Sequence, residues 1–579
     1  MHEGAAHARG GRWELAAEAY AAAAAANPQE VNAWLNLGIA LTRLGRFEEA
    51  VRALFSALRQ DQRCADAFAQ LGNLFQLMKM PEEACESFRN ALAFGRAPVE
   101  MLAAIVFASL EASRWDTLAQ DLAALETQVR EGRGQPLAFF SLNFSWDRAQ
   151  QLAASRAQAQ RLFGAIAPLP ARAARHAAGP IRVGYVSSDF HEHATAYLIA
   201  ELFERHDRAR FRLHAYSYGT DDGSPMRRRI EQAFGTGFVE ASRMDSRALA
   251  QRIRRDGVDV LIDLKGYTLY SRSDVFAYRA APVQVNFLGF PGTLGSANYD
   301  YIIGDPVVTP LDHAGGYCER IAQMPHCYQP NDRHRPRPQP RDRAHWGLPA
   351  EAFVFCCFNA NYKITPPVFA RWCALLRQVD DAVLWLFEAN AQARGNLTAQ
   401  AAAHGIAARR LYWAPNLPLD QHIARIGNAD LFLDTLPVNA HTTASDALWA
   451  GVPLVTVLGD TFVSRVAASL VSAAGLPELV AADLQDYERI ALGLARDRGR
   501  LATLRQRLEQ QRERAPLFDA AAFAAAFEGL LTRMVERSRA GLPAAPLAAT
   551  REVDSEAACV VRATAAPASP SPVAAFART

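Results

Sequence analysis

The hydrophobic and polar positions of the first hundred residues repeat with a period of 34. Glycine recurs at one place in this repeat and a large side chain at another: Gly4, Gly38 and Gly72, and Tyr20, Leu54 and Phe88. Small residues at fixed positions let the two helices of a hairpin approach closely, and large residues fill the space between hairpins. The pattern therefore predicts a solenoid of stacked helical hairpins in residues 1–98.

This period and this placement of small and large residues resemble the tetratricopeptide repeat, an α-helical solenoid with a concave groove. Residues 99–178 keep a helical pattern but lose the period, and they end in a stretch rich in Pro, Ala and Arg. We expect them to be degenerate helical repeats and a linker. Taken alone, such a solenoid is typical of a scaffold.

From residue 181 the pattern changes to short apolar runs that alternate with helical stretches. The runs that we expect to be strands lie at 181–187, 211–218, 258–264, 282–287 and 301–303, and then at 353–358, 382–387, 411–413, 429–433 and 454–458. Strands that alternate with helices predict parallel, doubly wound sheets. We expect two Rossmann-like halves, at 179–340 and 341–540, with ligands bound between them at the carboxyl ends of the strands.

Two Pro-rich segments lie outside this alternation. Residues 325–343 are rich in Pro and Arg, which indicates a crossing between the two halves. Residues 541–579 are rich in Ala, Pro and Ser and lack periodicity, which predicts a disordered tail.

Composition and charge limit the partners. A formal net charge of +2 over 579 residues gives no large field for nucleic acid. The 8 cysteines are scattered without a C-x-x-C pair, as is typical of a reduced, cytoplasmic protein. The N-terminus does not resemble a secretory signal, and no apolar run approaches the roughly 18 residues of a membrane helix. We therefore expect a cytoplasmic protein that binds neither nucleic acid nor membranes.

The stretch from Asp434 to Ser469 carries the strongest chemical signal. An apolar strand ends at Leu433, and after a turn the residues His441-Thr442-Thr443 begin a helical pattern. A polar helix start after a strand binds anions well, because unpaired N–H groups and the helix dipole point at the ligand. Two hydroxyls and an imidazole suit a phosphate or diphosphate, with Asp446 in reach of ribose hydroxyls. The alternative is an ordinary Thr cap with a structural aspartate.

Lysine is rare in this chain, which has only Lys79, Lys265 and Lys363. Lys363 comes just after the strand at 353–358, where its ammonium group would neutralise a leaving diphosphate. The alternative is a solvated loop lysine. Lys265 follows the strand at 258–264 in the same manner, with Arg272 shortly after it.

His422 and Arg425 lie three residues apart in a helical stretch, hence on one face of it. With Asn416 and Leu417 just before them, they would frame a flat base, with the arginine stacking on it or pairing with it. An ordinary amphipathic helix with two exposed polar side chains explains the pattern equally well.

The first half offers a histidine and a glycine-rich loop. His193 follows the first strand and would act as a base or orient an acceptor hydroxyl. His191 and His193 also suggest a metal, but no third ligand lies at a suitable spacing, so we expect none. The loop from Gly289 to Gly295 would bring main-chain N–H groups close to a ligand, although a tight connecting loop is an equal alternative.

Six motifs in order resemble one family: VGYVSSDFHEHAT, DLKGYT, PVQVNFLGFPGTLG, DYIIGDP, FNANYKITP and LDTLPVNAHTTASDALWAGVPLVT. They resemble the O-linked N-acetylglucosamine transferase/SPINDLY family of protein glycosyltransferases, up to about residue 535. The resemblance implies an α-helical tetratricopeptide-repeat solenoid followed by an α/β GT-B fold. It also implies inverting, metal-independent transfer from a nucleotide sugar to Ser/Thr hydroxyls of acceptor proteins held by the repeat groove.

The resemblance assigns roles to residues that match the motifs. Lys363 would stabilise the leaving nucleotide diphosphate, and His193 would line the acceptor side as one candidate for the base. The other nucleotide-sugar contacts would come from Asn416, Leu417, His422, Arg425, His441, Thr442, Thr443, Asp446, Leu288 and Gly289, with Arg272 and Asn361 as further candidates.

Three departures leave the donor open. Animal members of the family carry glutamine, cysteine and lysine where this chain has Ala360, Val438 and Leu419. UDP-GlcNAc is the first expectation, with GDP-fucose or UDP-glucose as alternatives. A repeat scaffold with an inactive nucleotide-binding domain is the alternative of another class, and a homodimer is left open.

Overall fold

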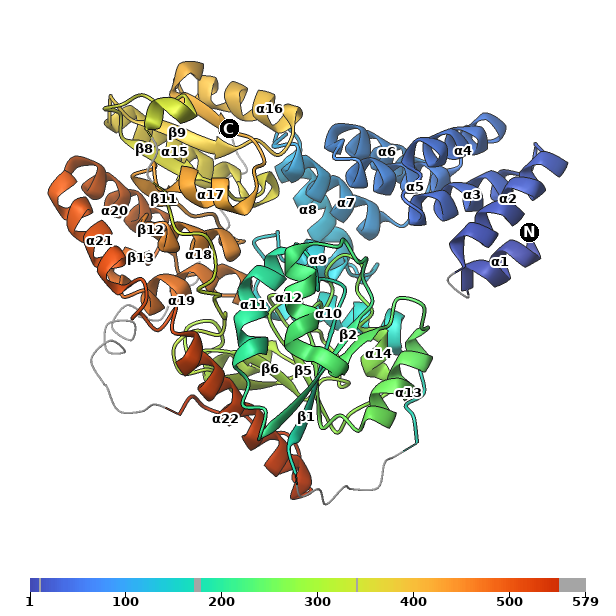
Figure 1. Ribbon diagram of the computed structural model, residues 1–579. Coiled ribbons are helices and arrows are strands. Elements are labelled where there is room, and N and C mark those ends of the chain that lie inside the picture. The colour runs from blue at the N-terminus through green and yellow to red at the C-terminus, as the bar shows by residue number, and fades with distance from the viewer. Residues whose placement is uncertain (10–11, 171–178, 340–341, 551–579) are drawn as a thin grey trace.

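The computed structural model describes residues 1–9, 12–170, 179–339 and 342–550 and consists of a helical array that projects from a body of two α/β halves (Figure 1). The array confirms the predicted solenoid. Its helices are α1 (His2–Arg9), α2 (Trp13–Ala26), α3 (Val31–Arg43), α4 (Phe47–Gln60), α5 (Ala65–Leu77), α6 (Pro81–Ala93), α7 (Pro98–Glu111) and α8 (Leu118–Arg130).

The glycines of the 34-residue period contact the large residues of the same period. A Cβ atom on Gly38 would lie 2.6 Å from Leu54 Cγ, and one on Gly72 would lie 2.4 Å from the Phe88 ring. Each pair joins the two helices of one hairpin. The large residue therefore packs over the glycine within a hairpin, whereas the sequence pattern suggests a place between hairpins.

Helices α9 (Ala138–Ser141) and α10 (Arg148–Phe163) belong to the core of the first α/β half, although we expected degenerate repeats there. Leu142 and Phe163 share a hydrophobic cluster with Leu261 and Phe290. A Cβ atom on Gly295 would lie 2.4 Å from the main-chain nitrogen of Arg156, so α10 lies directly on that loop. Part of the predicted linker, residues 171–178, lies outside the described residues.

The first half contains seven parallel strands in the order β3-β2-β1-β4-β5-β6-β7. They are β1 (Ile181–Ser187), β2 (Phe211–Ser217), β3 (Phe238–Glu240), β4 (Val260–Asp263), β5 (Val283–Asn286), β6 (Tyr301–Gly304) and β7 (Arg320–Gln323), and the helices are α11 (Ala194–Arg205), α12 (Pro225–Phe234), α13 (Ser246–Asp256) and α14 (Asp274–Ala277). Sequence reasoning missed β3 and β7, because these short edge strands have no long apolar run.

The second half contains six parallel strands in the order β10-β9-β8-β11-β12-β13. They are β8 (Val354–Cys357), β9 (Val383–Phe387), β10 (Leu411–Ala414), β11 (Leu431–Leu433), β12 (Leu454–Val457) and β13 (Val480–Ala481). The helices are α15 (Pro366–Gln378), α16 (Ala391–Ala403), α17 (Leu419–Ile426), α18 (Thr442–Trp449), α19 (Val466–Ala473), α20 (Leu484–Arg496) and α21 (Arg498–Gln511). Both sheets have the Rossmann order, in which the strand order reverses between β1 and β4 and between β8 and β11.

The chain returns from the second half to the first through α22 (Ala520–Arg539). The Phe527 ring lies 5.1 Å from that of Phe287, and Leu547 pairs with Ala322 at the edge of the first sheet. The tail predicted from residue 541 is therefore wrong for its first residues, because edge pairing orders Leu547. Residues 551–579 lie outside the described part.

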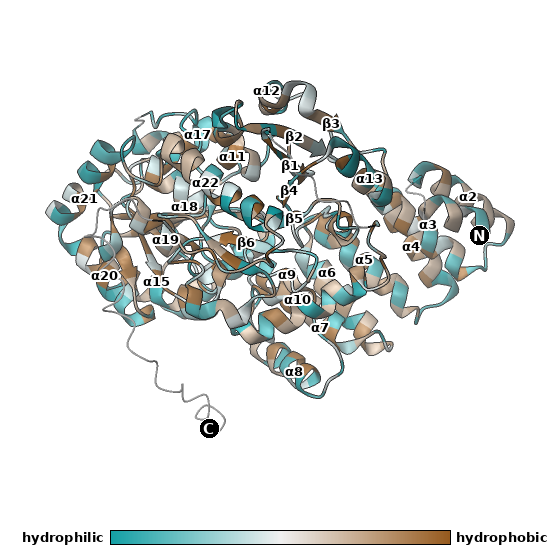
Figure 2. Cartoon of the chain, turned by 90° about the horizontal axis from the view of Figure 1, so that it is seen from below, coloured by the Kyte–Doolittle hydropathy of each residue, from teal (hydrophilic) through white to brown (hydrophobic). Residues whose placement is uncertain are grey.

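Hydrophilic residues cover outer helices such as α13 and α21, while the strands are hydrophobic (Figure 2). Among the described helices, none has both the length and the apolar character needed to cross a membrane.

Candidate functional site

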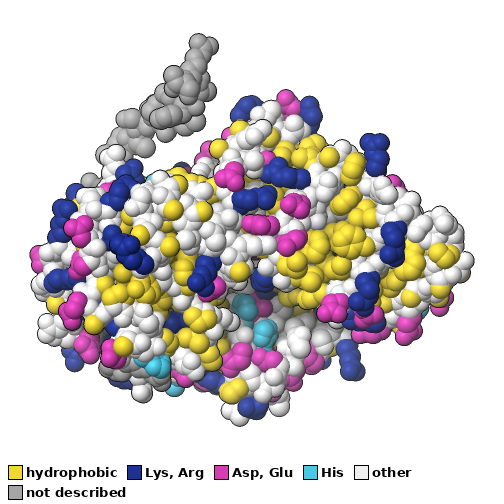
Figure 3. All heavy atoms as spheres, turned by 90° about the horizontal axis from the view of Figure 1, so that it is seen from above, with side chains coloured by type: hydrophobic (Ala, Val, Ile, Leu, Met, Phe, Trp, Pro, Cys, Tyr) yellow, Lys and Arg dark blue, Asp and Glu magenta, His cyan; other side chains and the backbone are white. Residues whose placement is uncertain are grey.

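The candidate site lies where the strand order of the second sheet reverses. The segments after β8 and β11 carry Lys363 and the turn to α18, and both leave the carboxyl ends of neighbouring strands. The face of the molecule in Figure 3 has a hollow in which histidine side chains are visible between hydrophobic walls. Ligands of open α/β sheets bind at such strand reversals.

Lys363 is half-buried at the end of a short 3-10 helix, Asn361–Lys363. Its Nζ donates a hydrogen bond to the carbonyl oxygen of Asn439 at 2.8 Å. Loss of hydration lowers the pKa of Lys363 to about 8, although Asp434 opposes the shift. Lys363 thus contacts the turn that leads to α18, and its role at a leaving diphosphate stays a prediction.

Asp434 fixes the turn between β11 and α18. Its carboxylate accepts hydrogen bonds from the main-chain N–H of Ala440 at 2.6 Å and from Thr456 Oγ1 at 2.6 Å. Burial raises the pKa of Asp434 to about 6 despite these bonds. The buried carboxylate of Asp434 therefore fixes the turn from its protein side, so that the opposite side of the turn can face a ligand.

The start of α18 carries the predicted His-Thr-Thr sequence. His441 is the N-cap residue, but its side chain caps no helix N–H. Thr443 Oγ1 donates to Asn359 Oδ1 at 2.5 Å, so this hydroxyl ties the helix start to the segment after β8. Burial lowers the pKa of His441 well below its usual value, with Lys363 acting in the same direction.

Several buried polar atoms around Lys363 have no hydrogen-bond partner among the described residues. They are both side-chain polar atoms of Asn361, Oδ1 of Asn439 and Nε2 of His441. An unpaired buried polar group is costly. Their concentration next to the half-buried ammonium group of Lys363 indicates a place built for a polar ligand.

Asp446 is already paired with a residue that sequence reasoning missed. Arg335 is 6% exposed, and its Nη1 donates to Asp446 Oδ1 at 2.9 Å. Burial raises the pKa of Asp446 to about 6, against the effect of Arg335. Asp446 Oδ2 lies 3.9 Å from Nε2 of His422. The Asp446 carboxylate therefore has the structural role that we gave as the alternative to a ribose contact. Its second oxygen, Oδ2, faces His422, the residue predicted to contact the nucleotide base.

The segment around Arg335 connects β7 of the first half to β8 of the second, so it is the crossing that its composition predicts, and part of it is buried. Gln329, Asn331 and Asp332 are buried, and Gln329 Nε2 donates to Ser445 Oγ of α18 at 2.8 Å. The only sequence signal was a cluster of amides and carboxylates before the arginine-rich run.

Arg425 lies behind His422 and does not present a stacking surface. It is 2% exposed, and its Nε and Nη2 both donate to His422 Nδ1, at 3.1 and 2.9 Å. Its guanidinium also bonds to the carbonyl of Pro415 and lies 5.1 Å from the Phe358 ring centroid. This geometry does not fit the stacking of Arg425 on a base, while pairing with a base stays a prediction. The arginine orients His422, and burial lowers the pKa of His422 to about 3.

Asn416 and Leu417 lie in the loop between β10 and α17, with Asn416 exposed and Leu417 half-exposed. Their main chain is next to Pro415, whose carbonyl is held by Arg425. The structure thus brings the loop and His422 to the same end of the sheet, and their contact with a base stays a prediction.

In the first half, His193 is the N-cap of α11. Its Nδ1 accepts a hydrogen bond from the Thr195 N–H at 3.1 Å and lies 3.4 Å from Oδ2 of Asp189. Burial lowers the pKa of His193, and Asp189 opposes this shift. Because Nδ1 is an acceptor here, the neutral ring carries its proton on Nε2.

The loop after β5 is tightly constrained. Leu288 has a φ of +71°, which is rare for a side-chain-bearing residue, and a Cβ atom on Gly289 would lie 2.0 Å from the carbonyl oxygen of Leu264. Strain of this kind is concentrated at functional sites. The two predicted residues are thus fixed beside the segment that follows β4.

Arg272 is not brought to the other candidates. Its guanidinium donates to the carbonyl of Ala241 at 3.3 Å and to Ser246 Oγ at 3.2 Å, and it stacks on Tyr218. The residue braces the segments that follow β2 and β3, at one edge of the first sheet.

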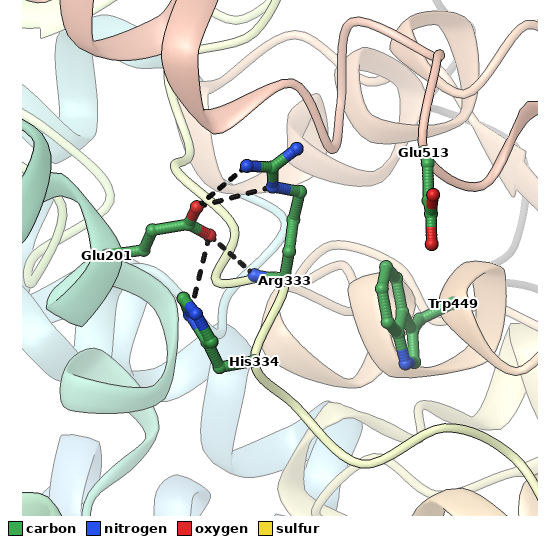
Figure 4. A pocket seen from close by; sticks show the side chains of 5 residues that line it. All are labelled: Glu201, Arg333, His334, Trp449 and Glu513. Carbon is green, nitrogen blue, oxygen red and sulfur yellow. Dashed lines mark hydrogen bonds and ion pairs between the residues drawn. The ribbon is translucent and has the colours of Figure 1, made fainter.

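A small pocket of about 240 Å³ lies between the two halves and is lined by Glu201, Arg333, His334, Trp449 and Glu513 (Figure 4). The predicted site residues do not line it.

Among the described residues, Glu201, Asp332 and His334 form the one group with metal-ligand spacing. Arginines already neutralise both carboxylates: Arg205 and Arg333 bond to Glu201, and Arg229 bonds to Asp332.

Sequence profiles agree with this architecture. The profile of glycosyl transferase family 41 matches residues 168–338 and 339–527, and a tetratricopeptide repeat profile matches residues 3–75. A solved structure, a mutant of the O-GlcNAc transferase from Thermobaculum terrenum, aligns with a TM-score of 0.70 and 26% identity over 93% of this chain and 97% of that chain. The GT-B fold with its repeat array is therefore confirmed.

Two curated relatives show the same similarity. A probable UDP-N-acetylglucosamine–peptide N-acetylglucosaminyltransferase SEC of Arabidopsis thaliana is 37% identical over 347 residues, covering 58% of this chain and 35% of the relative. The corresponding enzyme of Caenorhabditis elegans is 29% identical over 476 residues, covering 63% of this chain and 41% of the relative. The chain thus spans about two fifths or less of these relatives. Since the family profile covers most of both α/β halves, the chain belongs to glycosyl transferase family 41.

Proposed function

We propose that this protein transfers a sugar from a nucleotide sugar to Ser/Thr hydroxyls of proteins, with UDP-GlcNAc as the first donor. The observation that supports this most is the half-buried Lys363 beside the start of α18. Its ammonium group and the helix N-terminus point to one place, where a diphosphate would gain negative charge on leaving.

In the proposed reaction the acceptor hydroxyl oxygen bonds to the anomeric carbon, and the bond from that carbon to the diphosphate oxygen breaks. The hydroxyl proton leaves to a base, and the configuration inverts. Lys363 and the α18 N-terminus would supply the positive charge that a metal supplies in other transferases, so we propose metal-independent transfer. His193 would donate a hydrogen bond from Nε2 to a sugar or acceptor oxygen in its neutral form, which makes it a weaker candidate for the base.

His422, oriented by Arg425, and the loop at Asn416 and Leu417 would contact the base of the nucleotide. Asp446 would approach the ribose with its free oxygen. The repeat array would deliver acceptor proteins. The relatives named UDP-N-acetylglucosamine transferases support this donor first, while GDP-fucose and UDP-glucose stay alternatives.

Lys363→Met tests the proposal directly. Radiolabelled UDP-GlcNAc, UDP-glucose and GDP-fucose would be incubated separately with the enzyme and cell lysate, and labelled proteins and free sugar measured. We expect one donor to dominate and Lys363→Met to abolish transfer while the variant stays folded, as judged by a cooperative thermal transition. The matched control is Lys79→Met, which removes an exposed lysine of the array.

Undiminished transfer by Lys363→Met would overturn the assigned role of the lysine. A calorimetric titration that shows no binding of UDP or GDP would instead support a repeat scaffold with an inactive nucleotide-binding domain.

A further inference from the structure

A buried ion pair in the first half has no part in the proposed transfer. Lys265 is 4% exposed, and its Nζ lies 3.0 and 2.9 Å from the two carboxylate oxygens of Asp189, itself 6% exposed. Asp189 follows β1 and Lys265 follows β4, so the pair spans the strands between which the order reverses. Removing two charged groups from water costs free energy. Because this pair lies at the carboxyl ends of the strands, where ligands bind, we infer that it has a role at the site.

The carboxylate of Asp189 also reaches His193. Its Oδ1 accepts a hydrogen bond from Ser188 Oγ at 2.8 Å, and its Oδ2 lies 3.4 Å from His193 Nδ1. The same Nδ1 accepts the N–H of Thr195 at 3.1 Å. Nδ1 therefore has two competing neighbours: a donor, which suits the neutral ring, and an acceptor, which suits the protonated ring.

The net charge beside Nδ1 decides between these two states. An isolated buried carboxylate would favour a protonated imidazole, whose Nδ1–H would donate to Asp189 and leave the Thr195 N–H without its acceptor. Lys265 cancels that charge by bonding to both oxygens. We propose that Lys265 is a positioning residue that, through Asp189, holds His193 neutral with its proton on Nε2.

Three charged or titratable groups face the His193 ring, and they shift its pKa in different directions. Burial lowers the pKa of His193 most, Asp189 raises it, and Lys265 and His191 lower it. The His191 ring lies 5.8 Å from that of His193, and its Nδ1 lies 3.7 Å from Asp222. Of these groups, only Lys265 bonds directly to the carboxylate that faces Nδ1.

The consequence for the proposed transferase is a fixed hydrogen-bond donor on the acceptor side of the cleft. The role of this donor in sugar transfer rests on the proposed function, whereas the protonation state of His193 does not. The two are tested by separate measurements on the full chain.

The direct measurement is an NMR titration of histidine-labelled protein, in which the His193 signals are assigned by their absence in His193→Gln. In Lys265→Met we expect the pKa of His193 to rise by at least about one unit, as for a charge partner within 4–6 Å. Lys265→Arg keeps the charge and should leave that pKa near the wild-type value. In Asp189→Asn/Lys265→Met, which removes both charges, the rise should disappear.

The double variant also serves as the folding control, because Lys265→Met alone leaves Asp189 buried without its partner. The acidic limb of kcat/KM for donor hydrolysis should move upward in Lys265→Met by the same amount as the His193 pKa.

An unchanged His193 pKa in Lys265→Met, or an equal rise in the double variant, would overturn the inference. If the double variant alone folds, its His193 pKa should be within a few tenths of the wild-type value, and a clear rise would again be fatal. Absence of any sugar transfer, with the expected pKa changes intact, would refute the proposed function only.

Discussion

The ammonium group of Lys363 donates a hydrogen bond to the carbonyl oxygen of Asn439 at 2.8 Å. Asn439 lies two residues before His441, the N-cap of α18, and its own side chain donates to the carbonyl of Thr435 at 2.8 Å. The lysine and the helix start are thus one connected unit. An ammonium group has three donors, and within the described ranges Nζ bonds only to this carbonyl, which leaves two donors for the oxygens of a ligand.

The first prediction concerns the pH dependence of Lys363. Burial lowers its pKa to about 8 in the free protein. The charged form is lost as pH rises through this value, so kcat/KM for donor hydrolysis should fall above about pH 8, because kcat/KM reports the free enzyme. The measurement is a pH profile of wild type against Lys363→Arg. The arginine variant should retain part of the activity and lack this basic limb.

The second prediction is that the lowered pKa of Lys363 changes how the stability of the protein depends on pH. Between about pH 8 and the usual pKa of 10.5, the unfolded chain holds a proton on Lys363 that the folded protein has released. The free energy of unfolding should therefore rise with pH in this window through the contribution of Lys363. A chemical denaturation series would detect it as a difference from Lys363→Met, and equal slopes for the two proteins would contradict it.

Local sequence signals predicted the elements and the ends of strands well. The apolar runs located ten of the strands, and the helix start at Thr442 and the lysine after β8 followed from them. Pairings between distant residues left no such signal. Arg335 and Asp446 are 111 positions apart, and Arg425 looked exposed because helical spacing alone does not show that Phe358 and Pro415 cover it.

The third prediction concerns the glycines of the array. Gly72→Ala places a Cβ atom 2.4 Å from the Phe88 ring, which must then move in a packed hairpin. Overpacking of this kind costs about 1–3 kcal/mol, so urea denaturation should show a lower stability of the array. Gly493→Ala in α20 is the matched control, because no atom outside its own helix lies within 4 Å of the added Cβ. It should stabilise by up to about 1 kcal/mol, and equal effects of the two changes would exclude the proposed packing.

The fourth prediction concerns the buried pair of Arg335 and Asp446. Arg335→Met leaves the Asp446 carboxylate buried without its cation, which typically costs about 3–5 kcal/mol. The measurement is the thermal midpoint at pH 7.5 and at pH 5. Since burial already raises the pKa of Asp446 to about 6, the carboxyl group takes up a proton at pH 5 and the deficit should shrink there.

Arg335→Met/Asp446→Asn is the control for this pair. It removes both charges, so its midpoint should lie closer to the wild type at pH 7.5 than that of the single variant. A deficit in Arg335→Met that is the same at both pH values would show that Arg335 acts by packing on Trp449 instead of by its charge.

The last prediction connects the array to the lysine. The Phe107 ring of α7 lies 5.3 Å from that of Tyr362, the residue before Lys363, and the array is also fixed to α16, where Asn396 donates to the carbonyl of Ala112 at 2.9 Å. Phe107→Ala removes the support behind Tyr362, so Lys363 loses its fixed position. Because a misplacement of about 1 Å costs up to about a hundredfold in rate, we expect donor hydrolysis to slow by about ten- to a hundredfold.

The control is Phe55→Ala, at an exposed phenylalanine of α4, which should leave hydrolysis unchanged. Hydrolysis needs no acceptor, so a Phe107→Ala variant that glycosylates proteins poorly but hydrolyses the donor normally would mean that the array acts through acceptor delivery alone.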